Sequence, residues 1–167
     1  MNEKINIGKL IITKINENGQ KQKYLAEKMQ CSESEISRIC QNEDIDTKKL
    51  ILLCIYLECN FFDVYTEYID RQIPKENSLS LSHIYKFITT EKIHIGKLIK
   101  TIKKERKITS AAMANKIGCC EKNIYRLYKR ENIDTNLLII ISKHLKFNFF
   151  EIYAEFVDEQ IQKKKHF

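Results

Sequence analysis

Residues 7–39 read IGKLIITKINENGQKQKYLAEKMQCSESEISRI, and residues 95–127 read IGKLIKTIKKERKITSAAMANKIGCCEKNIYRL. The two stretches are parts of one repeat, because residues 5–73 align with residues 93–161 without a gap at a constant offset of 88. Each copy is 69 residues long. That length is enough for one small helical domain but leaves it only marginally stable alone. We therefore expect the two copies to pack together.

The apolar positions within each stretch recur with the period of a helix. In the first copy they predict helices over residues 6–18 and 21–29, and Gly19 is a natural stop for the first of these. A sharp turn follows, after which Ser32 and Glu35 have the spacing of a capping box at the start of a third helix. The pattern predicts two helices joined by a tight turn.

The later part of each copy predicts two more helices. Thr47 and Thr135 are suitable N-caps for a fourth helix, which ends at Leu57 and Leu145, respectively. A fifth helix carries an aromatic stripe, formed in the two copies by Phe61, Val64, Tyr65, Tyr68 and Ile69, and by Phe149, Ile152, Tyr153, Phe156 and Val157. The stripe either closes the core of its own domain or also docks the two copies, or two chains, against each other.

The composition fits an all-α protein of the cytoplasm. The 167 residues include one proline and 4 glycines. The longest apolar run, residues 50–57, is far shorter than the roughly 20 residues of a membrane helix, so we expect no membrane segment. The 6 cysteines show no Cys-x-x-Cys pair and no zinc spacing. We interpret them as buried, reduced side chains, and we expect neither a metal site nor a cofactor.

Both stretches resemble the helix-turn-helix domains of the Cro/lambda-repressor-like family, also called the XRE family. The resemblance rests on a small residue where two helices cross, a residue that tolerates positive φ at the turn, and apolar anchors at fixed distances. These positions hold Leu25, Ala26, Met29, Cys31, Ile36 and Ile39 in the first copy, and Met113, Ala114, Ile117, Gly118, Cys119, Ile124 and Leu127 in the second. The first copy departs from the pattern at Gln30, where a residue other than glycine has to adopt the strained turn.

The resemblance implies an all-α fold with two tandem five-helix domains. The first domain is expected at residues 1–73, and the second, with a basic C-terminal tail, at residues 93–167. Residues 74–92 form the linker, in which apolar spacing predicts a helix over residues 79–90. The linker then reaches roughly 40 Å, enough for two half-sites one DNA turn apart.

In this family the third helix enters the major groove of DNA and touches base edges. The base-reading positions that the resemblance implies are Glu33, Ser34, Ser37 and Arg38 in the first copy, and Glu121, Lys122, Tyr125, Arg126 and Lys129 in the second. Phosphate contacts are implied for Gln22, Lys21 and Lys23, and for Thr109, Ser110 and Arg130. Lys122 and Arg126 can donate to guanine, whereas the first copy presents the carboxylate of Glu33.

Charge divides unequally between the copies. Residues 5–73 hold 9 Lys and Arg against 11 Asp and Glu, a net charge of −2, and residues 93–161 hold 13 against 8, a net charge of +5. The chain as a whole carries +7. Basic surfaces favour polyanions because binding releases condensed counterions. We therefore expect the second copy to be the principal DNA reader and the target site to be asymmetric.

Together these features predict a transcriptional regulator that binds double-stranded DNA as a fused pseudo-dimer. The competing hypothesis is a protein-interaction module, as in antitoxins or phage-derived regulators of this family, with a protein partner at the acidic first copy. A homodimer through the aromatic fifth helices is a further hypothesis. We do not expect an enzyme, because the sequence has no glycine-rich phosphate loop and its 4 histidines are scattered.

Overall fold

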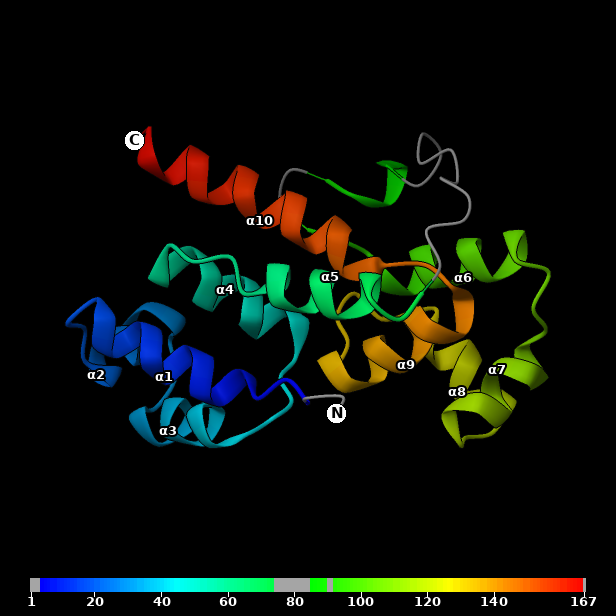
Figure 1. Ribbon diagram of the computed structural model, residues 1–167, viewed down its shortest axis with the longest axis horizontal. Helices are drawn as coiled ribbons and strands as arrows, with labels where there is room; N and C mark the ends of the chain where they lie inside the picture. Colours follow the sequence, from blue (N-terminus) through cyan, green and yellow to red (C-terminus); the bar gives the residue numbers. More distant parts are fainter. Residues whose placement is uncertain (1–3, 74–84, 90–91, 167) are drawn as a thin grey trace. The chain divides into compact units, whose positions relative to one another are not determined.

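The computed structural model describes residues 4–73, 85–89 and 92–166. These residues form ten α-helices and one 3₁₀ turn, which confirms the all-α class (Figure 1). In chain order the elements are α1 (Ile7–Glu17), α2 (Gln22–Met29), α3 (Glu33–Gln41), α4 (Thr47–Leu57), α5 (Phe62–Asp70), η2 (Tyr85–Phe87), α6 (Ile95–Glu105), α7 (Ser110–Ile117), α8 (Glu121–Leu127), α9 (Thr135–Leu145) and α10 (Phe149–Lys165). No helix in the described ranges is both long and apolar enough to cross a membrane.

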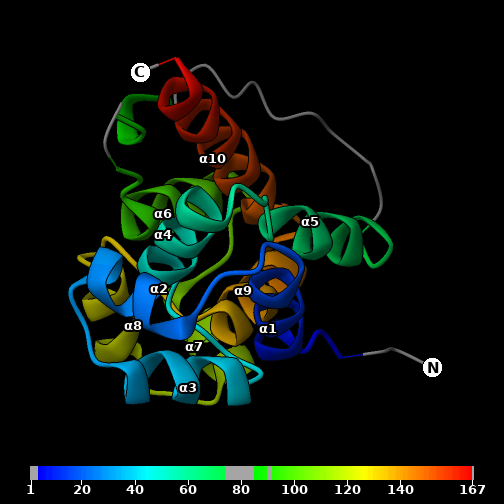
Figure 2. The same ribbon diagram turned by 90° about the vertical axis from the view of Figure 1, so that its left-hand side faces the viewer.

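The order of the helices is the same in the two halves of the chain. Helices α6, α7 and α9 begin 88 positions after α1, α2 and α4, and each has the same length as its counterpart. The bounds predicted for α1 and α2 are confirmed to within one residue at each end. In the first half, α3 lies against both α1 and α2 (Figures 1 and 2).

The turn between α2 and α3 has the left-handed conformation expected from the sequence. Gln30 has a φ of 53°, and Gly118 at the corresponding turn has a φ of 77°. One backbone bond closes each turn: the Cys31 N–H donates to Ala26 O at 3.0 Å, and the Cys119 N–H to Ala114 O at 2.9 Å. The expectation that Gln30 carries the strained turn is therefore confirmed.

Replacing Gln30 with glycine should stabilise the first helix-turn-helix. A left-handed residue with a Cβ costs roughly 1–2 kcal/mol, and the extra entropy of an unfolded glycine offsets roughly 0.5–1 kcal/mol of the gain. We expect a net gain of about 0.5–1 kcal/mol, measured as a higher melting temperature by circular dichroism. The matched change Gly118→Ala should shift stability the opposite way, and a lower melting temperature for Gln30→Gly would contradict the assignment of strain.

The helix caps correct two details of the sequence prediction. Ser32 Oγ accepts from the Glu35 N–H at 3.2 Å, as a capping box requires, but the Glu35 carboxylate accepts from Lys49 Nζ instead of returning to the cap. Thr47 is not the cap of α4, because Asp46 precedes the helix and its carboxylate accepts from the Lys48 N–H at 2.9 Å. Thr47 is instead the buried first residue of α4, and Thr135 is likewise the buried first residue of α9, with Asp134 at the N-cap position.

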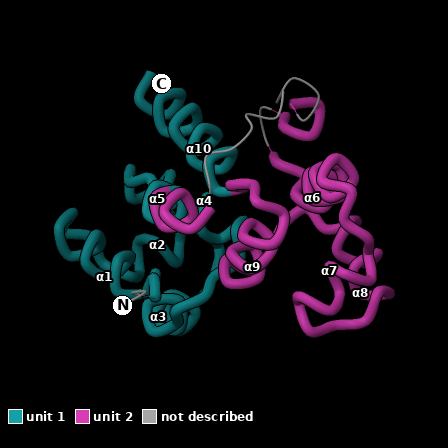
Figure 3. Tube along the Cα trace, turned by 45° about the vertical axis from the view of Figure 1, so that its right-hand side comes forward, with its two compact units in different colours: residues 1–66, 150–167 teal, residues 67–149 magenta. Residues whose placement is uncertain are grey.

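The chain divides into two compact units (Figure 3). Unit 1 comprises residues 1–66 and 150–167, and unit 2 comprises residues 67–149. Unit 1 thus contains α1 to α4, the first part of α5 and nearly all of α10, whereas unit 2 contains the end of α5 and α6 to α9. The units divide the chain differently from the sequence repeat, because the last helix of the second copy packs with helices of the first.

Aromatic stacking joins α5 and α10 within unit 1. The rings of Tyr65 and Phe150 lie 4.7 Å apart at 8°, and those of Phe62 and Tyr153 lie 4.9 Å apart at 9°. The Tyr153 hydroxyl lies 3.4 Å from Thr47 Oγ1, and burial raises the pKa of this tyrosine. The structure therefore shows contact between the fifth helices of the two copies, in which Tyr65 and Tyr153 of the predicted stripes each stack on a phenylalanine next to the other stripe.

Unit 2 fixes the end of α5 through polar contacts. Lys143 Nζ lies 3.3 Å from the Tyr68 hydroxyl and 4.9 Å from the centre of its ring. Asn148 Nδ2 donates to Asp70 Oδ1 at 2.8 Å. Both α9 and the segment after it therefore hold the last turn of α5.

The predicted linker helix is wrong where the structure describes it. Tyr85–Phe87 is a single 3₁₀ turn, and Ile88 pairs with Ile93 in an isolated antiparallel bridge. The His94 N–H donates to Phe87 O at 2.9 Å, which ties this turn to the start of α6. The rest of the predicted helix, residues 79–84 and 90, lies outside the described residues.

The cysteines are free thiols, but only Cys40 and Cys54 are buried. Burial raises the pKa of the Cys54 thiol above its ordinary value. Cys120 is exposed as the residue that precedes α8. The interpretation of all six as buried apolar side chains was therefore too broad.

Candidate nucleic-acid interface

The start of the first helix in each half is fixed against the end of the third. The Gly8 N–H donates to Asn42 O at 3.0 Å, and the Gly96 N–H donates to Arg130 O at 2.9 Å. A Cβ added to Gly96 would lie 2.5 Å from Leu127 O, and one added to Gly8 would clash with Cys40 O. Only glycine permits this approach, so the shared Ile-Gly-Lys-Leu motif positions the third helices.

Helix α3 presents its predicted base-reading side chains to solvent. Glu33, Ser34 and Arg38 are exposed, and Ser37 is half-buried. Ser37 Oγ donates to Gln22 Oε1 at 2.6 Å, which connects α3 to the first residue of α2. The structure thus brings a predicted base reader and a predicted phosphate contact into one surface.

The start of α2 can also bind an anion through its backbone. Lys21 precedes the helix, and its side chain makes no capping hydrogen bond. The first N–H groups of a helix lack partners inside the helix and point toward its N-terminus. The exposed ammonium groups of Lys21 and Lys23 add positive charge beside them.

The electrostatics of α3 are nonetheless acidic at its first turn. Glu33 and Glu35 both lie there. The hydrogen bond from Lys49, at 2.5 Å, lowers the pKa of the Glu35 carboxyl, and Arg38 contributes from 3.9 Å. Glu35 is therefore ionised and paired, which leaves Glu33 as the exposed negative charge.

Helix α8 presents a more basic surface. Its predicted readers Glu121, Lys122, Tyr125 and Arg126 are all exposed, and the Tyr125 side chain is 56% accessible. Arg126 Nη1 donates to Asn123 Oδ1 at 3.3 Å, an exposed contact that a base could replace.

The remaining candidates of unit 2 lie beside α8. The helix ends at Leu127, so Lys129 and Arg130 are exposed in the turn after it and are not part of the recognition helix. This corrects the prediction, which placed Lys129 on the helix.

The start of α7 is joined to the end of α8 by side chains. Ser110 Oγ lies 3.4 Å from the Tyr128 hydroxyl and accepts from Lys103 Nζ at 3.3 Å. The Thr109 hydroxyl caps α7 by accepting from the Ala112 N–H at 3.1 Å. Thr109 and Ser110 were both predicted as phosphate contacts, and Thr109 therefore already has a structural role as the cap of α7.

Residues 12–67 match the family model of the Cro/C1-type HTH DNA-binding domain. This segment, called the HTH domain below, is similar to a Cro/C1-type HTH DNA-binding domain. The match includes α2, α3, α4 and most of α1 and α5, and it lies within the first sequence copy. No curated protein and no solved structure matches the chain.

The HTH domain is not the more basic part of the molecule. Unit 1, which contains nearly all of it, holds 12 Lys and Arg against 14 Asp and Glu, a net charge of −2. Unit 2 holds 17 against 8, a net charge of +9. The asymmetry between compact units is larger than the asymmetry between sequence copies, because the four acidic side chains of α10, which belong to the second copy, lie in unit 1.

Proposed function

We propose that the protein is a transcriptional regulator that binds specific sites in double-stranded DNA. The HTH domain supports DNA binding by the first half of the chain. The observation that carries the proposal further is that α8, which occupies the position of α3 in the helix order, exposes Lys122 and Arg126 on a unit of net charge +9. Lysine and arginine side chains can donate to guanine in the major groove, and their positive charge is attracted to the DNA phosphates.

The proposed binding mode is that of a fused pseudo-dimer in the cytoplasm. One chain supplies two recognition helices, α3 and α8, so a single copy can engage two half-sites about 34 Å apart. The exposed side chains of the two helices differ, and the operator is therefore asymmetric. In this mode unit 2 is the principal reader and the HTH domain of unit 1 reads the weaker half-site.

A protein partner at α3 is the second candidate function. The exposed Glu33 in the first turn and the net charge of −2 on unit 1 favour it, because both repel phosphates. A homodimer through the fifth helices stays a separate prediction. It would use their exposed side, where Val64 lies, since Tyr65 and Tyr153 are buried within one chain.

Selection from random double-stranded DNA with the purified chain tests the proposed function. We expect an enriched motif with two unlike halves. A single half-site would show that only one helix reads bases and would favour the protein partner at α3. No enrichment would contradict DNA-specific binding. Repeating the selection at higher salt is the control, because phosphate-dependent binding weakens steeply with ionic strength and an apolar protein interface does not.

A further inference from the structure

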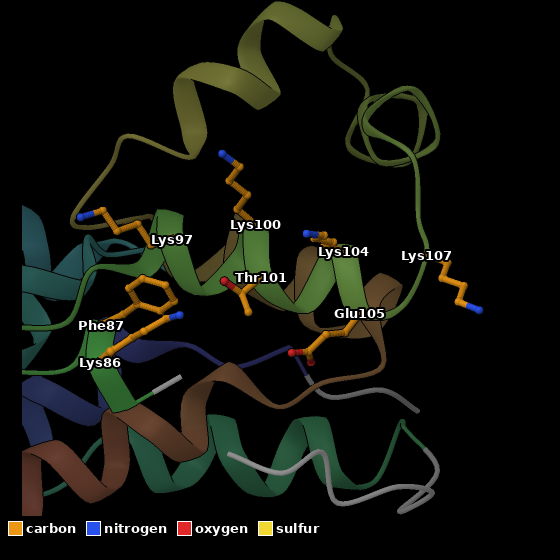
Figure 4. Close-up of a pocket in the computed structure, with 8 residues that line it drawn as sticks. All are labelled: Lys86, Phe87, Lys97, Lys100, Thr101, Lys104, Glu105 and Lys107. Carbon is orange, nitrogen blue, oxygen red and sulfur yellow. The ribbon is translucent and has the colours of Figure 1, made fainter. Parts of the chain in front are cut away.

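A lysine-lined groove runs along α6 in unit 2 (Figure 4). It has a volume of about 730 Å³, and its lining residues are Lys86, Phe87, Lys97, Lys100, Thr101, Lys104, Glu105 and Lys107. Five of these eight residues are lysines and one is acidic. The positive charge of these lysines favours an anionic ligand.

The cations of the groove are available to a ligand. Lys97, Lys100, Lys104 and Lys107 are exposed. None of these four forms a salt bridge with a carboxylate in the described part of the chain. Lysine stems can cover a groove wall while their ammonium groups stay in water, and Figure 4 shows Lys97 and Lys100 extending from the same edge of α6.

We propose that this groove binds the DNA backbone that flanks the base-reading site. Lys97 and Lys104 are seven residues apart, about 10 Å along a helix. One DNA strand places a phosphate about every 3.4 Å along the axis, so about three phosphates fit this span. A regular row of cations on one helix matches a uniform row of phosphates better than it matches an acidic protein segment, in which carboxylates alternate with other side chains.

The groove is continuous with the surface already assigned to phosphates. Lys100 Nζ lies 6.0 Å from the centre of the Tyr128 ring, and the hydroxyl of that tyrosine lies 3.4 Å from Ser110 Oγ. Tyr128 directly follows α8, the proposed recognition helix, and Ser110 begins α7. A backbone held at Ser110 can therefore continue past Lys100 into the groove. This inference rests on the proposed function, because it extends the same DNA complex.

The double variant Lys97→Gln with Lys104→Gln tests the groove in the full chain. Both residues are exposed, and glutamine has nearly the same helix propensity as lysine, so the fold should be retained. We expect weaker binding of the selected DNA and of unrelated DNA by the same factor, because phosphate contacts carry no sequence information. The slope of log affinity against log salt should fall by about 1.8, or about 0.9 for each lost contact.

The control is Lys28→Gln with Lys163→Gln, which removes the same charge from exposed lysines outside the groove.

Hydroxyl-radical footprinting supplies a second readout. The stretch of DNA protected beyond the selected motif should become shorter only in the groove variant. If the groove variant and the control bind and protect DNA alike, the groove inference is wrong while the proposed function stands. If the unaltered chain binds no DNA, both fail. Unchanged DNA binding with lost binding of polyglutamate would assign the groove to an acidic protein.

Discussion

Replacing Gly96 with alanine is expected to destabilise unit 2 by about 3 kcal/mol. The new Cβ would lie 2.5 Å from Leu127 O, a backbone atom that cannot rotate away. Overpacking of this kind costs about 1–3 kcal/mol, and the hydrogen bond from the Gly96 N–H to Arg130 O would be strained as well. The free energy of unfolding in urea, followed by circular dichroism, measures the loss.

The sign of the change in the free energy of unfolding shows whether packing or helix propensity dominates at this position. In an open helix, alanine is more stable than glycine by about 1 kcal/mol. A gain in stability for Gly96→Ala would therefore show that the close approach to α8 is absent. Gly19→Ala is the control for conformation alone, since Gly19 has a φ of 61° and no atom within 4 Å of an added Cβ. It should cost only about 0.5–1 kcal/mol, the same balance of left-handed strain and unfolded-state entropy as at Gln30.

Combining Lys122→Ala with Arg126→Ala should abolish sequence-specific DNA binding. Each well-placed contact to a base contributes about 1–3 kcal/mol of discrimination, so losing both should lower affinity for the selected site by about 100-fold or more. Both side chains are exposed, and the fold should be unaffected. Competition of the selected site against unrelated DNA, at one fixed salt concentration, measures the loss of specificity.

Glu33→Ala is the matched test on the HTH domain of unit 1. It should change affinity little, or raise it slightly, because the substitution removes an exposed negative charge from the proposed DNA surface. The reverse ranking, with Glu33→Ala abolishing specific binding and the double variant binding normally, would make α3 the principal reader. Circular dichroism of each variant should show unchanged helix content.

The sequence alone located most of the helices, since a helix is determined by residues close to one another, but it misplaced the cap of α4, the end of α8 and the linker helix. The period of the apolar residues located α1 and α2, and the expected strain at Gln30 is present as a φ of 53°. Only one of the two hydrogen bonds of the predicted capping box is present: Ser32 Oγ accepts from the Glu35 N–H, but the Glu35 carboxylate accepts from Lys49 on another helix. Contacts between helices lie beyond what residue spacing can show.

The role of Gly8 and Gly96 was missed for the same reason. The sequence showed that the Ile-Gly-Lys-Leu motif recurs, but only the distances from the added Cβ atoms to the end of the third helix explain it. Predicting Lys129 on α8 failed because no glycine or proline in the sequence marks the end of that helix at Leu127. The groove along α6 was not predicted, because residue spacing does not show that Phe87, in the turn before the helix, lines it together with the lysines of α6.

The division of α10 and α5 between the units has a consequence for how the chain folds during translation. Residues 150–167 leave the ribosome only after the whole of unit 2, residues 67–149, has been made. At about 5–20 residues per second, this delay is about 4–17 s. During that time Phe62 and Tyr65 have no stacking partner from α10, and the nascent HTH domain exposes the aromatic side of α5. Unit 2, which is contiguous in sequence, can therefore be the first to complete its core.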